Sequence, residues 1–459
     1  MGGTEKMKRN ELVVLFFFLC FSATFQRSLS AANQPPPKKK PAQTKKIGSS
    51  AVFPIYGNVY PLGYYSVSLK IGNPPKVYDL DIDSGSDLTW VQCDAPCTGC
   101  TKPRDQLYKP KNNTMHCADP ICSAIHSSNN HPCKSPTDQC DYEIEYADRG
   151  SSFGVLVRDS IPLTFSNGST LGPRLAFGCG YDQTYGGPGA PPQTAGVLGL
   201  GNGKASILSQ LTQMGLTRNV VGHCLSSRGG GFLFFGDDFV PSSGITWTAI
   251  SQDYVDKHYG SGPAELYFGG KPAGIKGLEV IFDSGSSYTY FNSPAYEAVV
   301  NLVKKSLNGK PLKDTAEDKS LPICWKGNKA FKSVQDAKKF FTPLALSFTN
   351  FKHVQLQLLP EAYLIVTKLG SVCLGILNGT QVGLENLNII GDVSLQEKMV
   401  IYDNEKKQIG WGPVNCDRLP NVDADHNGAF SQPYAVNFGI AAESCPATRR
   451  KLRQEQHIK

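Results

Sequence analysis

Two short acidic segments hold the residues of this sequence that are best suited to chemistry. The first, "DLDIDSGSDLTWVQC" from Asp79 to Cys93, places Asp83 directly before Ser-Gly-Ser. The second, "VIFDSGSSYTYF" from Val280 to Phe291, repeats the pattern around Asp283. In both segments apolar residues precede the Asp-Ser-Gly-Ser, and hydrophobic or aromatic residues follow it. The repeat predicts two similar loops that each present one carboxylate.

Two carboxyl groups held within hydrogen-bond distance of each other can activate water. Because two like charges that close cannot both ionise, the pair shares one proton near acidic pH. One carboxylate can then deprotonate a water held between the groups, while the other protonates or polarises a carbonyl oxygen. This chemistry hydrolyses amides without a metal, a cofactor or a covalent intermediate. We therefore predict that Asp83 and Asp283 are catalytic and that the protein needs no cofactor.

The small residues around each acid fit this arrangement. A glycine lets each loop turn tightly, the first serine of each loop can bond across to the other loop, and the second can bond the neighbouring carboxylate. These supporting residues are Ser84, Gly85, Ser86, Ser284, Gly285 and Ser286. A lone Asp-Ser-Gly is usually a turn or a helix cap, so the prediction depends on the pair. The nearby Asp81 and Asp87 are expected to be solvated.

Hydrophobic alternation predicts the strands that must position the first loop. Apolar and polar residues alternate from Tyr65 to Ile71, as in a half-buried strand. "NPP" then predicts a turn and "KVYDLDID" the next strand, so a hairpin delivers Asp83. A second repeat follows each acidic motif, because "AGVLGLG" (195–201) and "LNIIGDV" (387–393) are both apolar segments closed by glycine. Two motifs in the same order predict two similar β-rich lobes with an active-site cleft between them.

Helical periodicity is limited to a few short segments. Ser293-Pro294 predicts a helix start with Ser293 as the cap, and the helical spacing continues to Gly309. A shorter helix is predicted over Ala205–Met214. The 46 Gly and 31 Pro favour a turn-rich β protein over a helical one. The predicted fold class is therefore mostly β with few short helices.

The chain of 459 residues is long enough for two domains with tails. A basic start, the apolar stretch Leu12–Phe25 and following small residues predict a secretory signal peptide, with an uncleaved signal anchor as the alternative. The Pro- and Lys-rich segment after it is expected to be flexible and is a possible short propeptide. The predicted divisions are a signal peptide 1–30, a flexible segment 31–55, an N-terminal lobe 56–245, a C-terminal lobe 246–416 and a polar tail 417–459. The N-terminal lobe contains a Cys-rich insertion at 93–140, and the lobes are expected to separate near Gly244–Ala249.

Charge and hydropathy exclude several classes of partner. Much of the formal charge of +7 lies in the tails, so binding to nucleic acid is not predicted. No other stretch approaches the roughly 20 apolar residues of a membrane span, and the polar tail has no glycolipid-anchor signal. No stable membrane anchor is therefore predicted. The eight histidines show no metal-ligand spacing, so no metal is expected.

Cysteines are the other conspicuous feature, because half of the 14 lie between Cys93 and Cys140. "CDAPCTGC" would suggest zinc in a cytosolic protein, but disulfides are favoured behind a signal peptide. The insertion is expected to be a disulfide-stapled surface element, with Cys445 in the tail left unpaired. Acceptor tripeptides for N-glycosylation at Asn112, Asn167 and Asn378 fit a secreted surface.

On these motifs the sequence resembles the pepsin-type aspartic proteases, most closely the plant nucellin-like group. The resemblance covers roughly Tyr60 to Cys416. The paired acidic loops, the "VLG" and "IIG" segments and Trp90 match the pepsin-type pattern. "FGCG" (177–180), "HCLSS" (223–227) and the cysteine-rich insertion match the plant group. The resemblance implies an endopeptidase that acts on polypeptides at acidic pH as a monomer, either outside the cell (in the cell wall) or in the vacuole.

The resemblance also implies roles for further residues. "EYADRGSSFG" (145–154) resembles the hairpin, or flap, that closes over substrate, with Tyr146 as the flap tyrosine and Trp90 supporting it. The implied disulfides are Cys93–Cys97, Cys100–Cys179, Cys117–Cys140, Cys122–Cys133, Cys224–Cys416 and Cys324–Cys373.

Two departures from the family pattern stand out. Both acidic loops read Asp-Ser-Gly where the family usually has Asp-Thr-Gly, and Arg149 stands in the flap where glycine is common. The main rival interpretation is a binding or inhibitor protein of the same fold with a weak or broken catalytic pair. Both acids are present here, which favours the enzyme. A storage or cell-wall protein has no separate support in the sequence.

Overall fold

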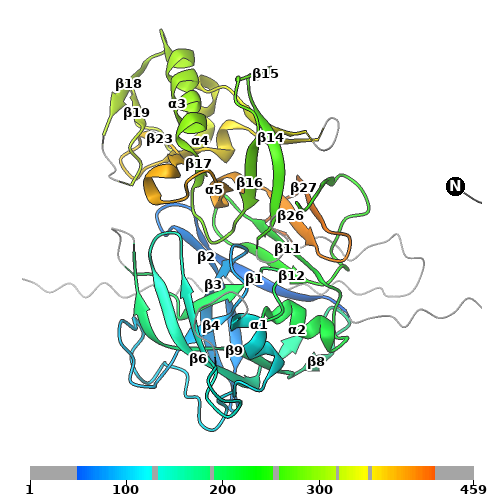
Figure 1. The fold of residues 1–459 in the computed structure, drawn as a ribbon. Coiled ribbons are helices and arrows are strands. Elements are labelled where there is room, and N and C mark those ends of the chain that lie inside the picture. Colours follow the sequence, from blue (N-terminus) through cyan, green and yellow to red (C-terminus); the bar gives the residue numbers. More distant parts are fainter. Residues whose placement is uncertain are drawn as a thin grey trace, which may run out of the picture. The chain divides into compact units, whose positions relative to one another are not determined.

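The computed structural model describes residues 49–126, 133–186, 191–251, 258–316, 320–349 and 354–418. The predicted signal peptide, the Lys-rich segment up to residue 48, and the tail after Arg418 with Cys445 lie outside these residues. The described part is mostly β, with few short helices, as predicted (Figure 1). None of its helices is long and apolar enough to cross a membrane.

The largest sheet has 13 strands and contains both the first and the last strands of the described chain. Its order is β13 (Thr246–Ala249), β27 (Gln408–Pro413), β26 (Lys398–Asp403), β11 (Val220–Leu225), β12 (Gly231–Phe235), β1 (Ala51–Asn58), β2 (Tyr64–Ile71), β3 (Lys76–Asp83), β10 (Gly196–Gly199), β4 (Trp90–Gln92), β9 (Arg174–Thr184), β6 (Ser151–Ser160) and β5 (Asp141–Glu145). The late strand β26, orange in Figure 1, thus pairs with β11 from the middle of the chain, and β27 pairs with β26 on its other side.

The remaining strands form three smaller sheets. An 8-stranded sheet contains β21 (Gln355–Leu358), β20 (Leu344–Phe348), β14 (Gly260–Phe268), β16 (Leu278–Phe282), β25 (Asn388–Ile390), β17 (Thr289–Phe291) and β24 (Ile376–Asn378) in that order, with β15 (Lys271–Pro272) beside β14. A 4-stranded sheet has β18 (Leu312–Thr315), β19 (Cys324–Gly327), β23 (Val372–Leu374) and β22 (Leu364–Val366), and a 2-stranded one pairs β7 (Leu163–Thr164) with β8 (Thr170–Leu171).

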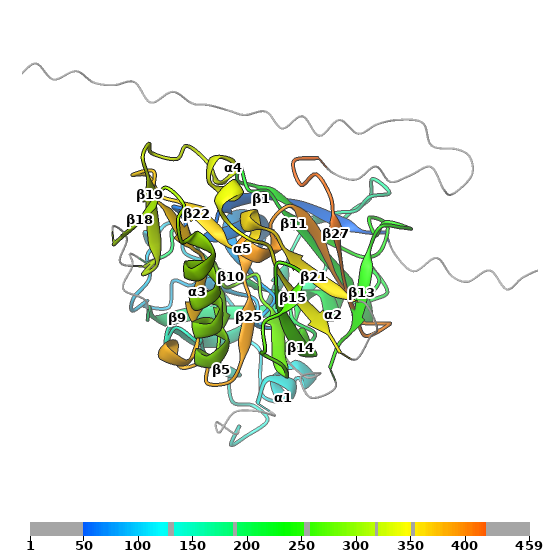
Figure 2. The same cartoon turned by 90° about the horizontal axis from the view of Figure 1, so that it is seen from above.

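Helices occupy few positions. The α-helices are α1 (Pro120–His126), α2 (Ile207–Gln213), α3 (Ser293–Leu307), α4 (Val334–Ala337) and α5 (Asp392–Leu395), and the 3₁₀ turns are η2 (Lys338–Phe340), η3 (Pro360–Ala362) and η4 (Thr380–Val382). The helix α3, prominent in Figure 2, packs against β17 and β24. Both predicted helices exist, but their caps differ. Asn292, not Ser293, caps α3 by accepting from the Ala295 N–H at 3.1 Å, and α2 begins after Ser206.

The repeat seen in the sequence is also a repeat of strand pairing. In the first copy, β10 pairs parallel with β3 and antiparallel with β4, and β4 pairs parallel with β9. In the second copy, β25 pairs parallel with β16 and antiparallel with β17, and β17 pairs parallel with β24. The acidic loop connects β3 to β4 in one copy and β16 to β17 in the other. The same local architecture therefore delivers both acids.

The predicted hairpin before Asp83 is confirmed, while the start of the ordered chain was predicted too late. Strands β2 and β3 pair antiparallel from Ile71↔Lys76 to Ser66↔Asp81. Order begins earlier with β1, part of which lies in the segment expected to be flexible. Its residues Ala51, Phe53 and Ile55 are buried, and β1 pairs with β12 as well as β2. At the expected lobe division, β13 pairs with β27.

The cysteine-rich insertion is more than a stapled surface element. It contains α1, which the sequence did not predict, and its Met115, Cys122 and Cys140 are buried with Trp90 and Tyr142 in one apolar cluster. The insertion therefore packs directly beneath strands that carry candidate site residues.

Four of the implied disulfides are wrong. Cys224–Cys416 and Cys324–Cys373 are present as implied, but the other eight cysteines pair as Cys93–Cys179, Cys97–Cys100, Cys117–Cys133 and Cys122–Cys140. Strand pairing explains the first change. The parallel register of β4 and β9 sets Val91 opposite Cys179, and the Cys93 N–H donates to the Gly180 carbonyl at 2.9 Å. Cys93 is thus held beside Cys179, which leaves Cys97 and Cys100 to each other.

Candidate active site

The two acidic loops are anchored by the second repeated motif. In the first copy, the register places Gly199 opposite Asp83, and the Leu200 N–H donates to the Asp83 carbonyl at 2.7 Å. In the second copy, the Asp283 N–H donates to the Ile390 carbonyl at 3.0 Å. The "VLG" and "IIG" segments therefore fix where each acid leaves its strand.

Crossed hydrogen bonds between Ser84 and Ser284 join the two loops. The Ser84 N–H donates to Ser284 Oγ at 3.1 Å, and the Ser284 N–H donates to Ser84 Oγ at 2.9 Å. Each hydroxyl then donates into the opposite strand, Ser84 Oγ to the Phe282 carbonyl at 3.1 Å and Ser284 Oγ to the Ile82 carbonyl at 3.2 Å. Both serines are buried. Four bonds with two-fold symmetry thus hold the acids in register, as the paired serines predicted.

Each carboxyl group receives the same two hydrogen bonds from its own loop. The Gly85 N–H donates to Asp83 Oδ1 at 2.8 Å, and Ser86 Oγ donates to Asp83 Oδ2. In the second loop, the Gly285 N–H donates to Asp283 Oδ1 at 2.8 Å and Ser286 Oγ to Asp283 Oδ2 at 2.7 Å. These bonds orient both carboxyl groups.

The two carboxyl groups face each other across the loop glycines. A Cβ atom on Gly85 would lie 2.7 Å from Asp283 Oδ1, and one on Gly285 would overlap Asp83 Oδ1. Neither glycine adopts a positive φ. The reason for glycine is therefore the close approach of the opposite acid, rather than the tight turn that the sequence suggested.

Burial and the facing acid change the titration of Asp83. Its side chain is buried, and burial followed by the negative charge of Asp283 raises the pKa of Asp83 above its ordinary value. Donation from Ser86 and Gly85 opposes this rise in pKa. A proton shared by the pair is the expected result.

The flap residues meet as the resemblance implied. The indole Nε1–H of Trp90 donates to the Tyr146 hydroxyl at 2.7 Å. Tyr146 follows β5 at the end of the β5–β6 hairpin, where its N–H donates to the Gly150 carbonyl at 2.8 Å. Burial first, and then the charge of Asp83, hold the pKa of Tyr146 well above its usual range, so the phenol stays neutral. Arg149 occupies the turn with a φ of 68°, a left-handed conformation that glycine adopts more readily.

A buried hydrogen-bond chain behind the first loop was not found from the sequence. The Tyr402 hydroxyl lies 3.3 Å from Ser84 Oγ, and His223 Nε2 lies 3.4 Å from the same hydroxyl. The Ser84 proton goes to the Phe282 carbonyl, so Tyr402 donates to Ser84 and the His223 Nε2–H donates to Tyr402. Burial lowers the pKa of His223 to about 3, which keeps the imidazole neutral. "HCLSS" contained His223, but no pattern connected it with Tyr402.

A further buried acid lies beside the pair. Asp392, the first residue of α5, is buried, and neither of its carboxyl oxygens has a hydrogen-bond partner among the described residues. Burial first, then the charges of Asp283, Asp81 and Asp83, hold the pKa of Asp392 well above its ordinary range. Asp392 is therefore a neutral acid beside the pair. The sequence signal that could have identified Asp392 is its place in the repeated motif "LNIIGDV".

Asp81 and Asp87 are half-buried and hydrogen-bonded within the fold, rather than freely solvated as expected. Thr194 Oγ1 donates to Asp81 Oδ2 at 3.0 Å, and Asp81 Oδ1 is buried without a partner in the described chain. Burial raises the pKa of Asp81 to about 7, against a small lowering by the Thr194 bond. Asp87 Oδ1 accepts from the Gly203 N–H at 2.7 Å, so it holds the loop after β10. Both acids are structural supports of the first loop.

The other predicted sites lie away from the acids. Asn112 and Asn167 are exposed, whereas Asn378 is half-buried and accepts from Ser293 Oγ at 3.0 Å. Among the described residues, the groups with metal-ligand geometry consist of Cys117, Cys122 and Cys133, and of Cys122, His126 and Cys140. All four cysteines are disulfide-bonded, so they offer no thiolate to a metal.

Comparisons with known proteins agree with this geometry. The family model described as "Xylanase inhibitor N-terminal" matches residues 65–237, and "Xylanase inhibitor C-terminal" matches residues 272–413. The chain is 43% identical over 387 residues to a protein named as an aspartic proteinase from Oryza sativa subsp. japonica, covering 82% of this chain and 93% of that protein.

Solved structures share the fold at lower identity. Basic 7S globulin from soybean aligns with a TM-score of 0.64 at 18% identity, covering 81% of this chain and 99% of the globulin. An aspartic proteinase from Irpex lacteus aligns with a TM-score of 0.56 at 16% identity, covering 80% of this chain and 98% of that protein. With two facing aspartates on a repeated β unit and these relatives, the chain belongs to the plant family of pepsin-type aspartic proteases.

Proposed function

We propose that this chain is an aspartic endopeptidase that hydrolyses peptide bonds at acidic pH through a water activated by Asp83 and Asp283. One observation carries the proposal. The crossed bonds of Ser84 and Ser284 hold the two loops together, with the carboxyl groups turned toward each other. A damaged relative would have no need to keep both acids, both glycines and all four serine bonds.

In the proposed reaction one acid accepts a proton while the other donates one. The ionised acid takes a proton from a water held between the carboxyl groups, and the protonated acid donates to the carbonyl oxygen of the scissile bond. The resulting hydroxide-like oxygen attacks the carbonyl carbon, and the tetrahedral intermediate loses the amine after protonation of its nitrogen. The bonds from Ser86 and Ser286 keep each carboxyl in position through this exchange.

The flap has a separate role in the proposal. Tyr146 is neutral and is held by Trp90 next to the charge of Asp83. A substrate lying over the acids would be covered by this hairpin, which would exclude water other than the reacting one. Polypeptides are the proposed substrates, bound as a monomer in the region between the two repeated β units.

The direct test is cleavage of a denatured protein substrate by the mature chain across acidic pH, with and without pepstatin, a mimic of the transition state. Asp83→Asn and Asp283→Asn should each remove nearly all turnover, because asparagine keeps the shape but cannot exchange the proton. Asp79→Asn is the matched control, since Asp79 lies on the same strand, is exposed and bonds only Ser68 through its side chain in the described contacts. Full activity in either catalytic variant would refute the assignment.

A second candidate function follows from the names of relatives. The matching family models are described as xylanase inhibitor domains, so the alternative is a binding or inhibitor protein that recognises another enzyme. Absence of cleavage by the processed parent at every acidic pH, together with inhibition of a xylanase, would favour this alternative. Inhibition that persists in Asp83→Asn would separate binding from catalysis.

The proposed function also includes a cellular location and N-glycosylation. We infer a secretory route ending outside the cell or in the vacuole, supported by the six disulfides of the described chain. Asn112 and Asn167 are exposed and are the better glycosylation sites. Asn378 is half-buried and bonded to Ser293, so it should be modified less fully.

A further inference from the structure

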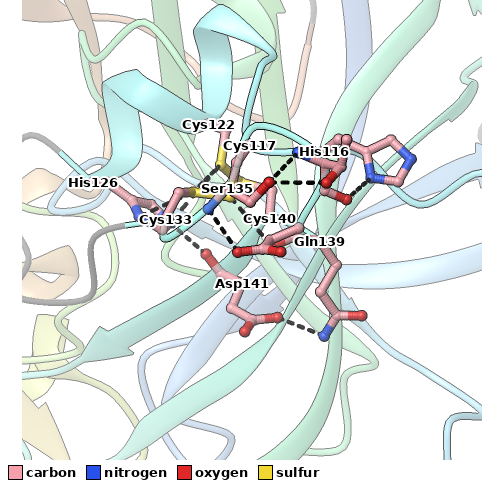
Figure 3. The surroundings of a disulfide bond; sticks show 11 residues. His116, Cys117, Cys122, His126, Cys133, Ser135, Gln139, Cys140 and Asp141 are labelled. Atoms are coloured by element: carbon pink, nitrogen blue, oxygen red, sulfur yellow. Dashed lines mark hydrogen bonds between the residues drawn. A yellow bond between two sulfur atoms is a disulfide. The ribbon is translucent and has the colours of Figure 1, made fainter.

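Two disulfides of the insertion lie against each other. Cys117–Cys133 and Cys122–Cys140 join four cysteines close to α1, and Figure 3 shows them in one group with His126. The Sγ atoms of Cys122 and Cys133, which belong to different disulfides, are 3.8 Å apart. Because thiol–disulfide exchange requires a thiolate to reach the sulfur of a disulfide, a freed Cys133 would need little movement to attack Cys122.

His126 provides a base at the same place. Its Nε2 lies 2.7 Å from the carbonyl oxygen of Asp141, and a carbonyl can only accept, so the ring proton is on Nε2. The unprotonated Nδ1 is then the atom that lies 3.9 Å from Cys133 Sγ. The imidazole therefore turns its lone pair toward the sulfur that would become the nucleophile.

Among the cysteines of this group that the structure describes, Cys133 is the most accessible to solvent. Cys133 is exposed, whereas Cys122 and Cys140 are fully buried and Cys117 is nearly so. A dissolved thiol must therefore attack Cys133 first. The exposure of Cys133 therefore determines that Cys117–Cys133 opens first. The 3.8 Å distance between Cys133 Sγ and Cys122 Sγ then determines that Cys122–Cys140 is attacked next.

We propose that these four cysteines form a thiol-exchange site, at which a small monothiol of the glutathione class converts the two disulfides into a single Cys122–Cys133 disulfide with His126 as the base. The first thiolate attacks Cys133 Sγ, forming a mixed disulfide and releasing Cys117 as a thiol after protonation. A second thiolate attacks the outer sulfur of the mixed disulfide. This step forms the oxidised small disulfide and frees Cys133 as a thiolate. At neutral pH this thiolate takes up a proton from solvent, and His126 Nδ1 removes that proton again to restore the nucleophile.

The last step is internal to the protein. The Cys133 thiolate attacks Cys122 Sγ, the Cys122–Cys140 bond breaks, and Cys140 leaves with the proton held by His126. In total, two small thiols are oxidised to one disulfide, one protein disulfide is reduced, and Cys117 and Cys140 end as thiols. The attacks by the small thiol use the exposed Cys133, and the internal attack and the proton transfer use atoms that lie 3.8 Å and 3.9 Å apart.

The product changes the covalent support of the flap hairpin. Cys140 directly precedes β5, the first strand of the β5–β6 hairpin that ends at Tyr146. Opening Cys122–Cys140 removes the covalent link from α1 to this strand, while Asp141 keeps its hydrogen bond to His126 of the helix. An effect on the activity of the flap rests on the proposed function, whereas the exchange chemistry does not.

The first experiment maps the thiols in the native, full-length protein. Free thiols are blocked with N-ethylmaleimide, reduced glutathione is added, and new thiols are trapped with iodoacetamide before unfolding and non-reducing peptide mapping. The expected product carries the second label on Cys117 and Cys140 and contains a Cys122–Cys133 cross-link. Labels on Cys117 and Cys133 with Cys122–Cys140 intact would overturn the exchange. Opening of Cys324–Cys373 before any insertion disulfide would overturn the selective access.

The second experiment tests the base with a matched pair of variants. His126→Gln removes the base. His116→Gln removes an exposed histidine of the same insertion, whose side chain bonds only the Thr137 carbonyl in the described contacts. In His126→Gln the first opening should keep the parent rate, while the Cys122–Cys133 cross-link should form roughly tenfold more slowly at pH 7, because fewer Cys133 thiols are ionised. His116→Gln should match the parent. Equal cross-linking rates in both variants would remove His126 from the mechanism.

Discussion

Replacing Asp81 by asparagine should stabilise the protein at pH 8 and change its stability little at pH 4. The side chain is held in β3 by a 3.0 Å bond from Thr194, and its other oxygen is buried without a partner among the described residues. The protonated acid suits this site better than the charged one, because a buried charge without a partner is costly. Asparagine copies the shape of the protonated acid and cannot ionise.

The sign and size of this change in stability with pH follow from the pKa of Asp81. Burial raises it from 3.8 to about 7, so the folded protein binds this proton more tightly than the unfolded chain does. The stabilisation is complete below about pH 4 and is lost as the pH rises through 7. Each unit of pKa corresponds to about 1.4 kcal/mol, so the parent should lose on the order of 4 kcal/mol from this group between pH 4 and pH 8. The variant should lose none of it.

Urea unfolding followed by tryptophan fluorescence at pH 4, 6 and 8 measures this difference. Asp83 adds a pH dependence of its own. Removing the charge of Asp81 also lowers the pKa of Asp392, which favours the variant at high pH too, so the difference reports Asp81 together with its effect on Asp392. The stability advantage of Asp81→Asn should grow steadily with pH, and Asp79→Asn on the same strand should show no such growth. A constant difference between parent and variant, or a variant that is less stable at pH 8, would refute the reasoning.

Two other substitutions probe the supports of the acidic loops. Tyr402→Phe should cost about 1–3 kcal/mol in the free energy of unfolding, because it leaves the buried His223 Nε2–H without its acceptor. Chemical denaturation measures this loss of stability. Peptide cleavage by the variant should show a lower kcat and an unchanged KM. Gly391→Ala should prevent recovery of folded protein, because a Cβ there would overlap the Tyr288 carbonyl oxygen. Gly379→Ala is its control, since the nearest atom to that Cβ lies at 3.3 Å; similar yields of the two variants would contradict the overlap.

The features predictable from sequence were those carried by short-range pattern or by repetition. Alternation placed β2 and β3, because each strand buries one face and the pattern is written in adjacent residues. The pair Asp83 and Asp283 was predictable because the same motif occurs twice with the same flanks. The crossed serine bonds followed, since two equivalent loops that meet must offer equivalent hydroxyls.

The features that escaped prediction depend on partners distant in the chain. Asp81 was expected to be solvated because the glycine turn follows Asp83 and not Asp81, but Thr194 and β10, from another part of the sequence, contact it. Tyr402 was not singled out from the sequence, since only the fold brings its hydroxyl to Ser84. The disulfide of Cys93 was decided by the parallel register of β4 and β9, which the spacing of cysteines does not encode.

The position of β26 and β27 in the largest sheet has a consequence for synthesis of the chain. Strand β11 pairs with β12 on one side and with β26 on the other. Cys224 in β11 cannot form its disulfide until Cys416, 192 residues later, has been synthesised. At about 5–20 residues per second, a ribosome needs about 10–40 s to make that stretch. During this interval the growing chain carries an unpaired strand edge, to which another nascent chain can add. A pause in translation between these points would lengthen the exposure of this edge.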